Sequence, residues 1–563
     1  MRNPITIVLF GAAAVTAPAA PPVVAVDTAG TRYGGVLAGA DWGRPLAAGD
    51  LDGDGYDEVI VSECESWGGV TSRVYVLRGG VRAHGRGWVD LSLTPADQVI
   101  IGAQVDDNLG ASVATGDVNG DGIDDLLLCA SMGDFGGVLD RGVAYLIYGG
   151  EHFFDNTVRN LSEGSAWNIR ILGPVAAGDM GGSNLFGGLD AQGAAIGRLN
   201  ADSYGDIVLG VHLADGGNTQ SGRVYVIFGN AWPSGFTFNL AVASNYGVRI
   251  DGRSRYDELG TCVLTADLTG DGLDELILGN EYYSRGLFTS DGATHIFRGR
   301  VTWPTYISLV STAADITLLG ARAQDELGTA AATGDFDGDG RRDLAVAAPG
   351  ADVGAHNTQR GDGIVYGLLG KTSYQTGTYL FDYATTAPDF RLLGEFEKNL
   401  GDTLSAGDFD ADGRTDLAAA ERFGGPATNG VVEILRGRPG LAGQTFTANV
   451  DTDLRILGAP QDRIGFWLSA CDHNADGLAE VLIGTPFNNG DRGTAYVFTW
   501  VSGDPDRDGD RDLRDVAFLQ RCVTGPGGGP LDPPCLLLDG DLDEDLDEYD
   551  AAWLCERLTG PGQ

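Results

Sequence analysis

The chain is poor in the residues that several kinds of catalysis require. Its six histidines form no HExxH motif and no i,i+4 pair. No GxSxG serine elbow is present, and the segment LLGKTS at 368–373 lacks the opening glycine of a phosphate-binding loop, because Val365 stands there. With 79 acidic residues, the sequence cannot nominate one general acid/base pair. It therefore gives no sign of a zinc hydrolase, a serine hydrolase or a P-loop enzyme.

Positive charge is scarce as well. Lysine and arginine together number 37 against 79 acidic residues, which gives a formal net charge of −42. This excess of negative charge argues against a nucleic-acid ligand and against an anionic membrane surface. No apolar run beyond the first 25 residues is long enough to span a bilayer. We therefore expect no nucleic-acid partner and no transmembrane segment.

The first 25 residues have the composition of a secretory signal. Arg2 supplies a positive start, and Ile5–Val15 is an apolar run too short to cross a membrane. Two small-residue stretches, Ala17–Ala19 and Val23–Ala25, are candidate cleavage sites. The sequence therefore predicts a signal peptide at 1–25 and a secreted protein that is extracellular or held at the cell surface.

What the chain has in abundance is acid at regular spacing. In DFDGDGRRD, residues 335–343, carboxylates stand at the first, third, fifth and ninth places. Gly340, at the sixth, can take the positive φ that turns the loop back on itself. The backbone carbonyl of Arg341, at the seventh, would point inward. Such a ring of oxygens suits a hard cation, above all Ca²⁺, although a single copy could equally be a solvated acidic turn.

The nonamer recurs seven times, with copies that start at 50, 117, 198, 267, 335, 408 and 472. This regular recurrence removes chance as an explanation. The copy at 198–206, RLNADSYGD, has lost the first carboxylate and the turning glycine, so we expect no ion there. In the other six copies, the residue at the seventh place would bind Ca²⁺ through its backbone carbonyl and the residues at the first, third, fifth and ninth places through their side chains. The predicted Ca²⁺ ligands are Asp50, Asp52, Asp54, Tyr56, Glu58, Asp117, Asn119, Asp121, Ile123, Asp125, Asp267, Thr269, Asp271, Leu273, Glu275, Asp335, Asp337, Asp339, Arg341, Asp343, Asp408, Asp410, Asp412, Arg414, Asp416, Asp472, Asn474, Asp476, Leu478 and Glu480.

Each repeat also carries four short apolar segments bounded by glycine, which is typical of antiparallel strands. Fixed-period repetition of a strand-rich unit indicates a propeller or a solenoid, and seven copies fall within the four to eight blades usual for a propeller. The seventh repeat lacks its outer strand, and one spare segment, Tyr33–Gly39, precedes the first repeat. We predict that this segment completes the seventh blade and removes the open edge. The predicted fold is an all-β, seven-bladed propeller of four-stranded blades over 31–502.

The repeats resemble the FG-GAP repeats of integrin alpha-subunit propellers. The naming motif is present as Phe186-Gly187 and, weakened, as Leu109-Gly110, Leu259-Gly260, Leu327-Gly328 and Leu400-Gly401. The resemblance implies a seven-bladed ring with Ca²⁺ in the hairpin between the first and second strands. It also implies that the metal loops line one face and that partners bind the opposite one. The long connections expected there include 62–72, 131–141, 279–292, 349–361 and 421–430.

The tail, residues 503–563, resembles a dockerin, with two EF-hand-like loops that each lead into a short amphipathic helix. The resemblance implies a small α-helical, Ca²⁺-binding domain and a cohesin-type partner. The usual small hydroxyl pair before the closing acid is replaced by Leu513-Arg514 and Glu548-Tyr549, which weakens the case for that partner more than the case for Ca²⁺. The predicted ligands are Asp504, Asp506, Asp508, Asp510 and Asp515 in the first loop, and Asp539, Asp541, Asp543, Asp545 and Asp550 in the second.

Two further motifs have structural interpretations. Arg360-Gly361-Asp362 spells an integrin-ligand tripeptide, yet it aligns with the start of the third strand in other repeats, which favours a structural role. Among the seven cysteines, Cys522 and Cys535 flank one loop and are the best disulfide candidates. The cysteines at 64, 129, 262 and 471 lie in four different repeats and are expected to be single and buried.

The sequence leaves three functions open. The first is a Ca²⁺-stabilised propeller that acts in adhesion or as a scaffold, with an extracellular protein or glycan on the face opposite the metal loops. The second is an extracellular polysaccharide-active enzyme, or an accessory subunit, docked through its tail. The third is a surface-layer component without a discrete ligand.

Overall fold

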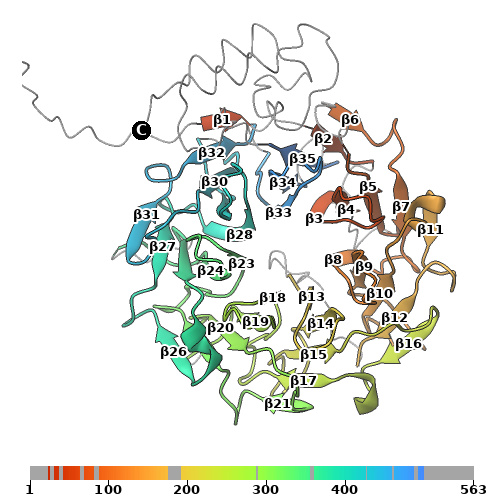
Figure 1. Ribbon diagram of the computed structural model, residues 1–563, viewed down its shortest axis with the longest axis horizontal. Coiled ribbons are helices and arrows are strands. Elements are labelled where there is room, and N and C mark those ends of the chain that lie inside the picture. The colour runs from red at the N-terminus through yellow and green to blue at the C-terminus, as the bar shows by residue number, and fades with distance from the viewer. Residues whose placement is uncertain are drawn as a thin grey trace, which may run out of the picture.

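Seven β-sheets stand in a ring around a central axis (Figure 1). The computed structural model describes residues 23–25, 31–36, 42–63, 69–80, 88–174, 192–286, 289–354, 361–426, 428–459, 462–486 and 492–499. The predicted seven-bladed propeller is confirmed over these residues, which contain no α-helix. The predicted dockerin-like domain at 503–563 lies outside the described residues.

The first three blades follow the chain from the innermost strand outward. Blade one is β3 (Trp42–Gly49), β4 (Glu58–Glu63), β5 (Arg73–Leu77), β7 (Gln98–Ile101) and β11 (Val158–Asn160). Blade two is β8 (Leu109–Gly116), β9 (Asp125–Ala130), β10 (Val143–Ile147), β12 (Ile169–Leu172) and β16 (Phe236–Asn239). Blade three is β13 (Ala194–Gly197), β14 (Asp206–Val211), β15 (Arg223–Ile227), β17 (Val248–Asp251) and β21 (Tyr306–Ser308).

The next three blades repeat this order. Blade four is β18 (Val263–Ala266), β19 (Glu275–Asn280), β20 (Ala293–Phe297), β22 (Ile316–Leu319) and β26 (Tyr379–Asp382). Blade five is β23 (Ala331–Gly334), β24 (Asp343–Ala348), β25 (Ile364–Leu368), β27 (Phe390–Leu393) and β31 (Gln444–Thr447). Blade six is β28 (Leu400–Gly407), β29 (Asp416–Glu421), β30 (Val431–Leu435), β32 (Leu454–Leu457) and β1 (Val23–Ala25).

Blade seven joins the two ends of the chain. It consists of β33 (Trp467–Cys471), β34 (Glu480–Thr485), β35 (Thr494–Phe498), β2 (Thr31–Gly34) and β6 (Trp88–Asp90). β2 pairs antiparallel with β35, so the predicted closure of the ring by an N-terminal strand is confirmed. The strand begins two residues before the predicted Tyr33–Gly39 segment and ends at Gly34. Three 3₁₀ turns, η2 (Phe153–Asp155), η3 (Ala243–Asn245) and η4 (Thr372–Gln375), lie in connections.

The prediction of four strands in each blade was wrong, because every sheet has a fifth strand. This outer strand runs parallel to the fourth strand of its own sheet. In the chain it belongs to the next blade, where it lies just before that blade's fourth strand. It is three or four residues long and partly exposed, as in β11 and β31. Such a segment carries no continuous apolar pattern, and sequence periodicity therefore does not reveal it.

The hydrophobic core lies between neighbouring blades. The second strand of each blade is buried at all six positions, which explains its nearly continuous apolar sequence. Seven apolar clusters each join two adjacent blades, and the one between the last and first blades includes Trp42, Tyr75 and Trp467. The indole N–H of Trp467 donates to the carbonyl of Leu46 at 2.8 Å across this junction. Each blade thus depends on both of its neighbours for burial.

Candidate metal centre

All seven nonamers lie in the hairpin between the first and second strands of a blade, as predicted. Because the blades share one orientation around the ring, these hairpins gather on one face of the propeller. The first residue of each nonamer comes directly after the innermost strand, and the ninth residue begins the second strand. The sheet thus holds both ends of every loop.

The carboxylate at the first place organises the loop. In the second repeat, Asp117 accepts hydrogen bonds from the backbone N–H groups of Gly120 (2.6 Å), Asp121 (3.1 Å) and Gly122 (2.8 Å). The first-place residues of the other acidic copies accept equivalent bonds, as at Asp50 and Asp267. Three donors on one carboxylate hold the loop in a tight turn.

Two more places set the curvature of the loop. The aspartate at the fifth place accepts the N–H of the seventh residue, for example Arg341 to Asp339 at 3.0 Å. The glycine at the sixth place is left-handed, with φ of 86° at Gly340, as the sequence predicted. The fourth place is left-handed as well. At Gly53 a Cβ would come within 2.9 Å of Cδ1 of Ile123 in the next blade, whereas the sixth and seventh loops have Ala411 and Ala475 at this place with positive φ.

The ninth carboxylate is the deepest group of the loop. In the fifth repeat, Asp343 is fully buried and accepts the N–H groups of Phe336 (2.9 Å) and Gly370 (2.8 Å). Burial raises the pKa of Asp343 to about 7, and it raises the pKa of Glu58 and of Glu275 to about 8. The field of nearby acids adds to this rise, so the ninth carboxyl tends to keep its proton until a cation enters the loop.

Three loops bring carboxylates together closely enough to hold one ion. The groups Asp50–Asp52–Glu58, Asp335–Asp337–Asp339 and Asp408–Asp410–Asp416 each offer ligand oxygens that lie within 4.8 Å of one another. The second, fourth and seventh loops have Asn119, Thr269 and Asn474 at the third place. These side chains offer neutral oxygens, so their loops carry one charge fewer.

The donor set fits a hard divalent cation. In the fourth loop, the Thr269 hydroxyl oxygen and one carboxylate oxygen of Glu275 are buried and have no hydrogen-bond partner among the described residues. One carboxylate oxygen of Asp52 in the first loop is in the same state. Buried oxygens without donors are costly, and a cation that prefers oxygen ligands would satisfy them. The acidic loops therefore suit Ca²⁺, with the carboxylates at places one, three, five and nine as candidate ligands.

The third loop holds a guanidinium in place of the first carboxylate. The Arg198 side chain donates to the backbone carbonyl of Asp202 within the same loop at 3.3 Å. The ninth residue, Asp206, is buried as in the other loops and accepts the N–H of Leu199 at 2.9 Å. The hairpin therefore keeps its shape with an internal positive charge, and the absence of an ion from this copy stays a prediction.

This difference gives a paired test on two fifth-place aspartates. We expect Asp339→Ala to reduce the number of tightly bound Ca²⁺ ions by one, because it removes a carboxylate from a complete loop. We expect Asp202→Ala to leave the number unchanged. Isothermal titration of the EDTA-stripped protein with Ca²⁺ gives both counts, and equal losses in the two variants would contradict the assignment of the third loop.

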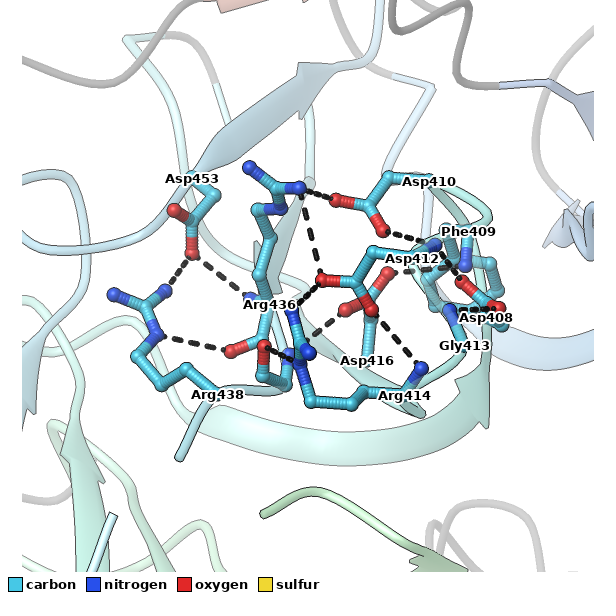
Figure 2. Close-up of polar contacts among 11 residues, drawn as sticks. Asp408, Phe409, Asp410, Asp412, Gly413, Arg414, Asp416, Arg436, Arg438 and Asp453 are labelled. Carbon is cyan, nitrogen blue, oxygen red and sulfur yellow. Dashed lines mark hydrogen bonds and ion pairs between the residues drawn. The ribbon is translucent and has the colours of Figure 1, made fainter. Parts of the chain in front are cut away.

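In the sixth loop, arginines already contact the acidic groups (Figure 2). Arg436, which directly follows β30, pairs with Asp410 and lies 3.8 Å from the carboxylate of Asp412. Arg414 within the loop also pairs with Asp412. At the equivalent position of blade one, Arg78 lies 3.5 Å from Asp52. These guanidinium groups stand where they would compete with a bound cation.

We therefore expect Arg436→Met to raise the Ca²⁺ affinity of the sixth loop by about tenfold, or ~1.4 kcal/mol. The same change leaves the buried Asp410 without its basic partner, so the Ca²⁺-free variant should melt at a lower temperature. Arg438→Met is the matched control, because Arg438 pairs with Asp453 and not with the loop. Competition against a fluorescent Ca²⁺ chelator measures the affinity, and a weaker affinity in Arg436→Met would refute the competition.

The loops also bind one another, which sequence reasoning missed. The eighth-place N–H of one blade donates to the first-place carbonyl of the preceding blade, as from Asp124 to Asp50 (3.2 Å) and from Gly205 to Asp117 (2.7 Å). Equivalent bonds join four further junctions, including Asp57 to Asp472 between the first and last blades. Between blades four and five, the donor is instead the backbone N–H of Lys371, in the connection after β25, which bonds the carbonyl of Leu268 at 3.1 Å. Backbone bonds thus link neighbouring loops directly at six of the seven junctions, which only the closed ring could reveal.

The remaining sequence motifs have structural roles where they are described. Asp362 of the Arg-Gly-Asp tripeptide is 2% exposed, and its carboxylate accepts the N–H groups of Val353 (2.8 Å) and Glu397 (3.0 Å). This supports the structural interpretation of that motif. Cys129, Cys262 and Cys471 are buried and free, as predicted. Cys64, Cys522, Cys535 and the tail loops lie outside the described residues.

Comparisons with known proteins agree with this architecture. Residues 109–147 and 327–368 match the family model of the FG-GAP repeat, and each match contains the first three strands of a blade with its acidic loop. The chain is similar to phosphatidylinositol-glycan-specific phospholipase D of Rattus norvegicus, with 30% identity over 166 residues, or 29% of this chain and 18% of that protein. It is also similar to integrin alpha pat-2 of Caenorhabditis elegans (28% over 217 residues; 36% and 15%) and to human integrin alpha-8 (27% over 232 residues; 38% and 18%).

The chain is therefore a seven-bladed β-propeller with FG-GAP repeats, similar to integrin alpha subunits in its propeller part. The matches span less than a fifth of each of these relatives. Within the described residues, no helix is long and apolar enough to cross a membrane.

Proposed function

We propose that the protein is a secreted, Ca²⁺-binding propeller that serves as an interaction scaffold. The observation that carries the proposal is the set of seven hairpins on one face, six of which have an acidic donor set that suits Ca²⁺. Ions there would cancel the repulsion between carboxylates and hold the hairpins together. The face is thereby stiffened, while the longer connections on the opposite face remain available for a partner.

The partner in this proposal is an extracellular protein or glycan that binds the face opposite the metal loops. Similarity to two integrin alpha chains supports an interaction role, although it covers only part of those proteins. The dockerin-like tail would attach the propeller to a larger extracellular assembly, through two further Ca²⁺ loops and a cohesin-like protein.

The leader in this proposal ends before Val23. β1 is the fifth strand of blade six and pairs with β32 at Val23–Arg455, Val24–Ile456 and Ala25–Leu457. Cleavage near Ala19 would leave this strand in the mature protein, whereas cleavage after Ala25 would remove it. Mass spectrometry of the secreted chain distinguishes the two positions.

A glycan array and a pull-down from extracellular material, both with the full chain, test the scaffold function. Each is run with Ca²⁺ and with EDTA. Ca²⁺-dependent capture of a specific partner, lost when the connections at 131–141 and 349–361 are replaced by short glycine-serine links, supports the proposal. Failure to bind any partner in Ca²⁺ would contradict it.

A further inference from the structure

A cavity of about 640 Å³ lies at the outer side of the junction between blades four and five, away from the metal loops. Arg322 in the β22–β23 connection, Arg391 on β27 and residues 443–445 at the start of β31 contribute to its walls. Two buried tyrosines, Tyr366 and Tyr383, stack at 4.4 Å between ring centroids and form part of its lining. The volume falls within the range of small-molecule sites.

The two arginines of this cavity differ from Arg223 and Arg298, which pair with Asp251 and Asp315. Within the described residues Arg322 and Arg391 form no ion pair. Arg322 donates one N–H to the carbonyl of Gly354 at 2.6 Å, and Arg391 donates one to the hydroxyl of Thr445 at 3.1 Å. These bonds orient both groups while leaving other N–H donors for a ligand.

The rest of the wall mixes apolar residues, such as Val353 and Ile364, with neutral polar ones and with two acids, Asp325 and the partly exposed Asp352. Thr385, Gln444 and Thr445 are exposed and present hydroxyl and amide groups. The Tyr366 hydroxyl has no hydrogen-bond partner among the described residues. Burial and the negative charge of Asp325 raise its pKa, and the charges of Arg391 and Arg322 oppose this rise. The carboxylate of Asp325 is turned into the wall, where it accepts the backbone N–H of Arg322 at 2.8 Å.

We propose that this cavity binds an acidic saccharide, with its carboxylate or sulfate group held by Arg322 and Arg391 and its hydroxyl groups by the neutral polar residues of the wall. Guanidinium forks match both oxyanions, which is why either group fits. A cavity this large holds more than a bare ion, and Thr385, Gln444 and Thr445 on its exposed wall offer hydroxyl and amide groups that can bind saccharide hydroxyls. The inference rests on the proposed scaffold function and names a ligand class for it.

Calorimetric titration of the full chain in Ca²⁺ tests the site with four probes. They are digalacturonate, a sulfated heparin disaccharide, neutral maltose and the acidic dipeptide Asp-Asp. We expect one of the two acidic disaccharides to bind at least tenfold more tightly than maltose and Asp-Asp. Whichever one binds shows whether the site prefers a carboxylate or a sulfate group. Arg322→Met and Arg391→Met should each weaken that binding at least tenfold at an unchanged melting temperature, whereas Arg438→Met, outside the cavity, should not.

Absence of binding by both acidic disaccharides would overturn the inference, as would equal binding of Asp-Asp or an equal loss in Arg438→Met. If these probes fail while the pull-down still captures a partner in Ca²⁺, the saccharide site is refuted and the scaffold function stands. If an arginine variant fails to fold, Tyr366→Phe and Thr445→Val replace it, with an expected loss of threefold or more.

Discussion

Removal of Ca²⁺ is expected to lower the melting temperature of this protein more than any single substitution in a metal loop. An ion that binds only the folded state stabilises it by RT ln(1 + [L]/Kd), or about 2.7 kcal/mol per site at a concentration of 100 Kd. Several loops act together, because their backbones are hydrogen-bonded to one another around the ring. Differential scanning calorimetry in 2 mM Ca²⁺ and in excess EDTA measures the difference.

Two controls separate specific binding from general screening of the negative charge. Excess Mg²⁺ should restore only part of the stability, because it demands a near-ideal octahedral site and gives up its water reluctantly. Sodium chloride at equal ionic strength should restore less. An unchanged melting temperature in EDTA, confirmed by metal analysis of the stripped protein, would end the case for structural Ca²⁺.

The second large effect is expected from deletion of the N-terminal strands. A variant without residues 1–34 loses β1 and β2, and with them the buried Thr31 and Tyr33. β2 lies between β35 and β6, so its loss exposes a strand edge that other chains can pair with. We expect a decrease in stability that exceeds the 3–5 kcal/mol typical of truncating one large buried aromatic residue. Calorimetry and size-exclusion chromatography should show a lower melting temperature and self-association.

Shorter deletions serve as matched controls. A variant without residues 1–22 keeps both strands and should match the full chain in melting temperature. A variant without residues 1–27 loses β1 alone and should lie between the two, since β1 contributes only three residue pairs to blade six. If all three variants melted alike and stayed monomeric, the N-terminal strands would not be what closes the ring.

Much of the architecture was predictable from the sequence, because its signals are local and repeated. The first, fifth and sixth places of a loop such as Asp335, Asp339 and Gly340 interact within a few residues, so their spacing alone encodes the hairpin. The second strands are buried on both faces and appear as unbroken apolar runs. The closing strand was predictable by counting, since one repeat lacked a segment and the N-terminus had a spare.

Other features depend on contacts that no local pattern carries. The fifth strands are short and half-exposed, and they become strands only because the fourth strand of another blade offers its edge. Arg436, which would compete with a cation in the sixth loop, comes from a different connection of the same blade than the loop itself. The cavity that holds Arg322 and Arg391 is assembled from two blades, and neither residue belongs to a recognisable motif.

The sequence by itself determined the repeat, the form of each acidic hairpin and the number of blades, because these follow from interactions between residues that are close along the chain. The tertiary structure decided how the hairpins join into a circle, which arginines meet the acidic groups and where a cavity remains. Those outcomes depend on the packing of whole blades, in which residues hundreds of positions apart, such as Asp57 and Asp472, come within hydrogen-bonding distance.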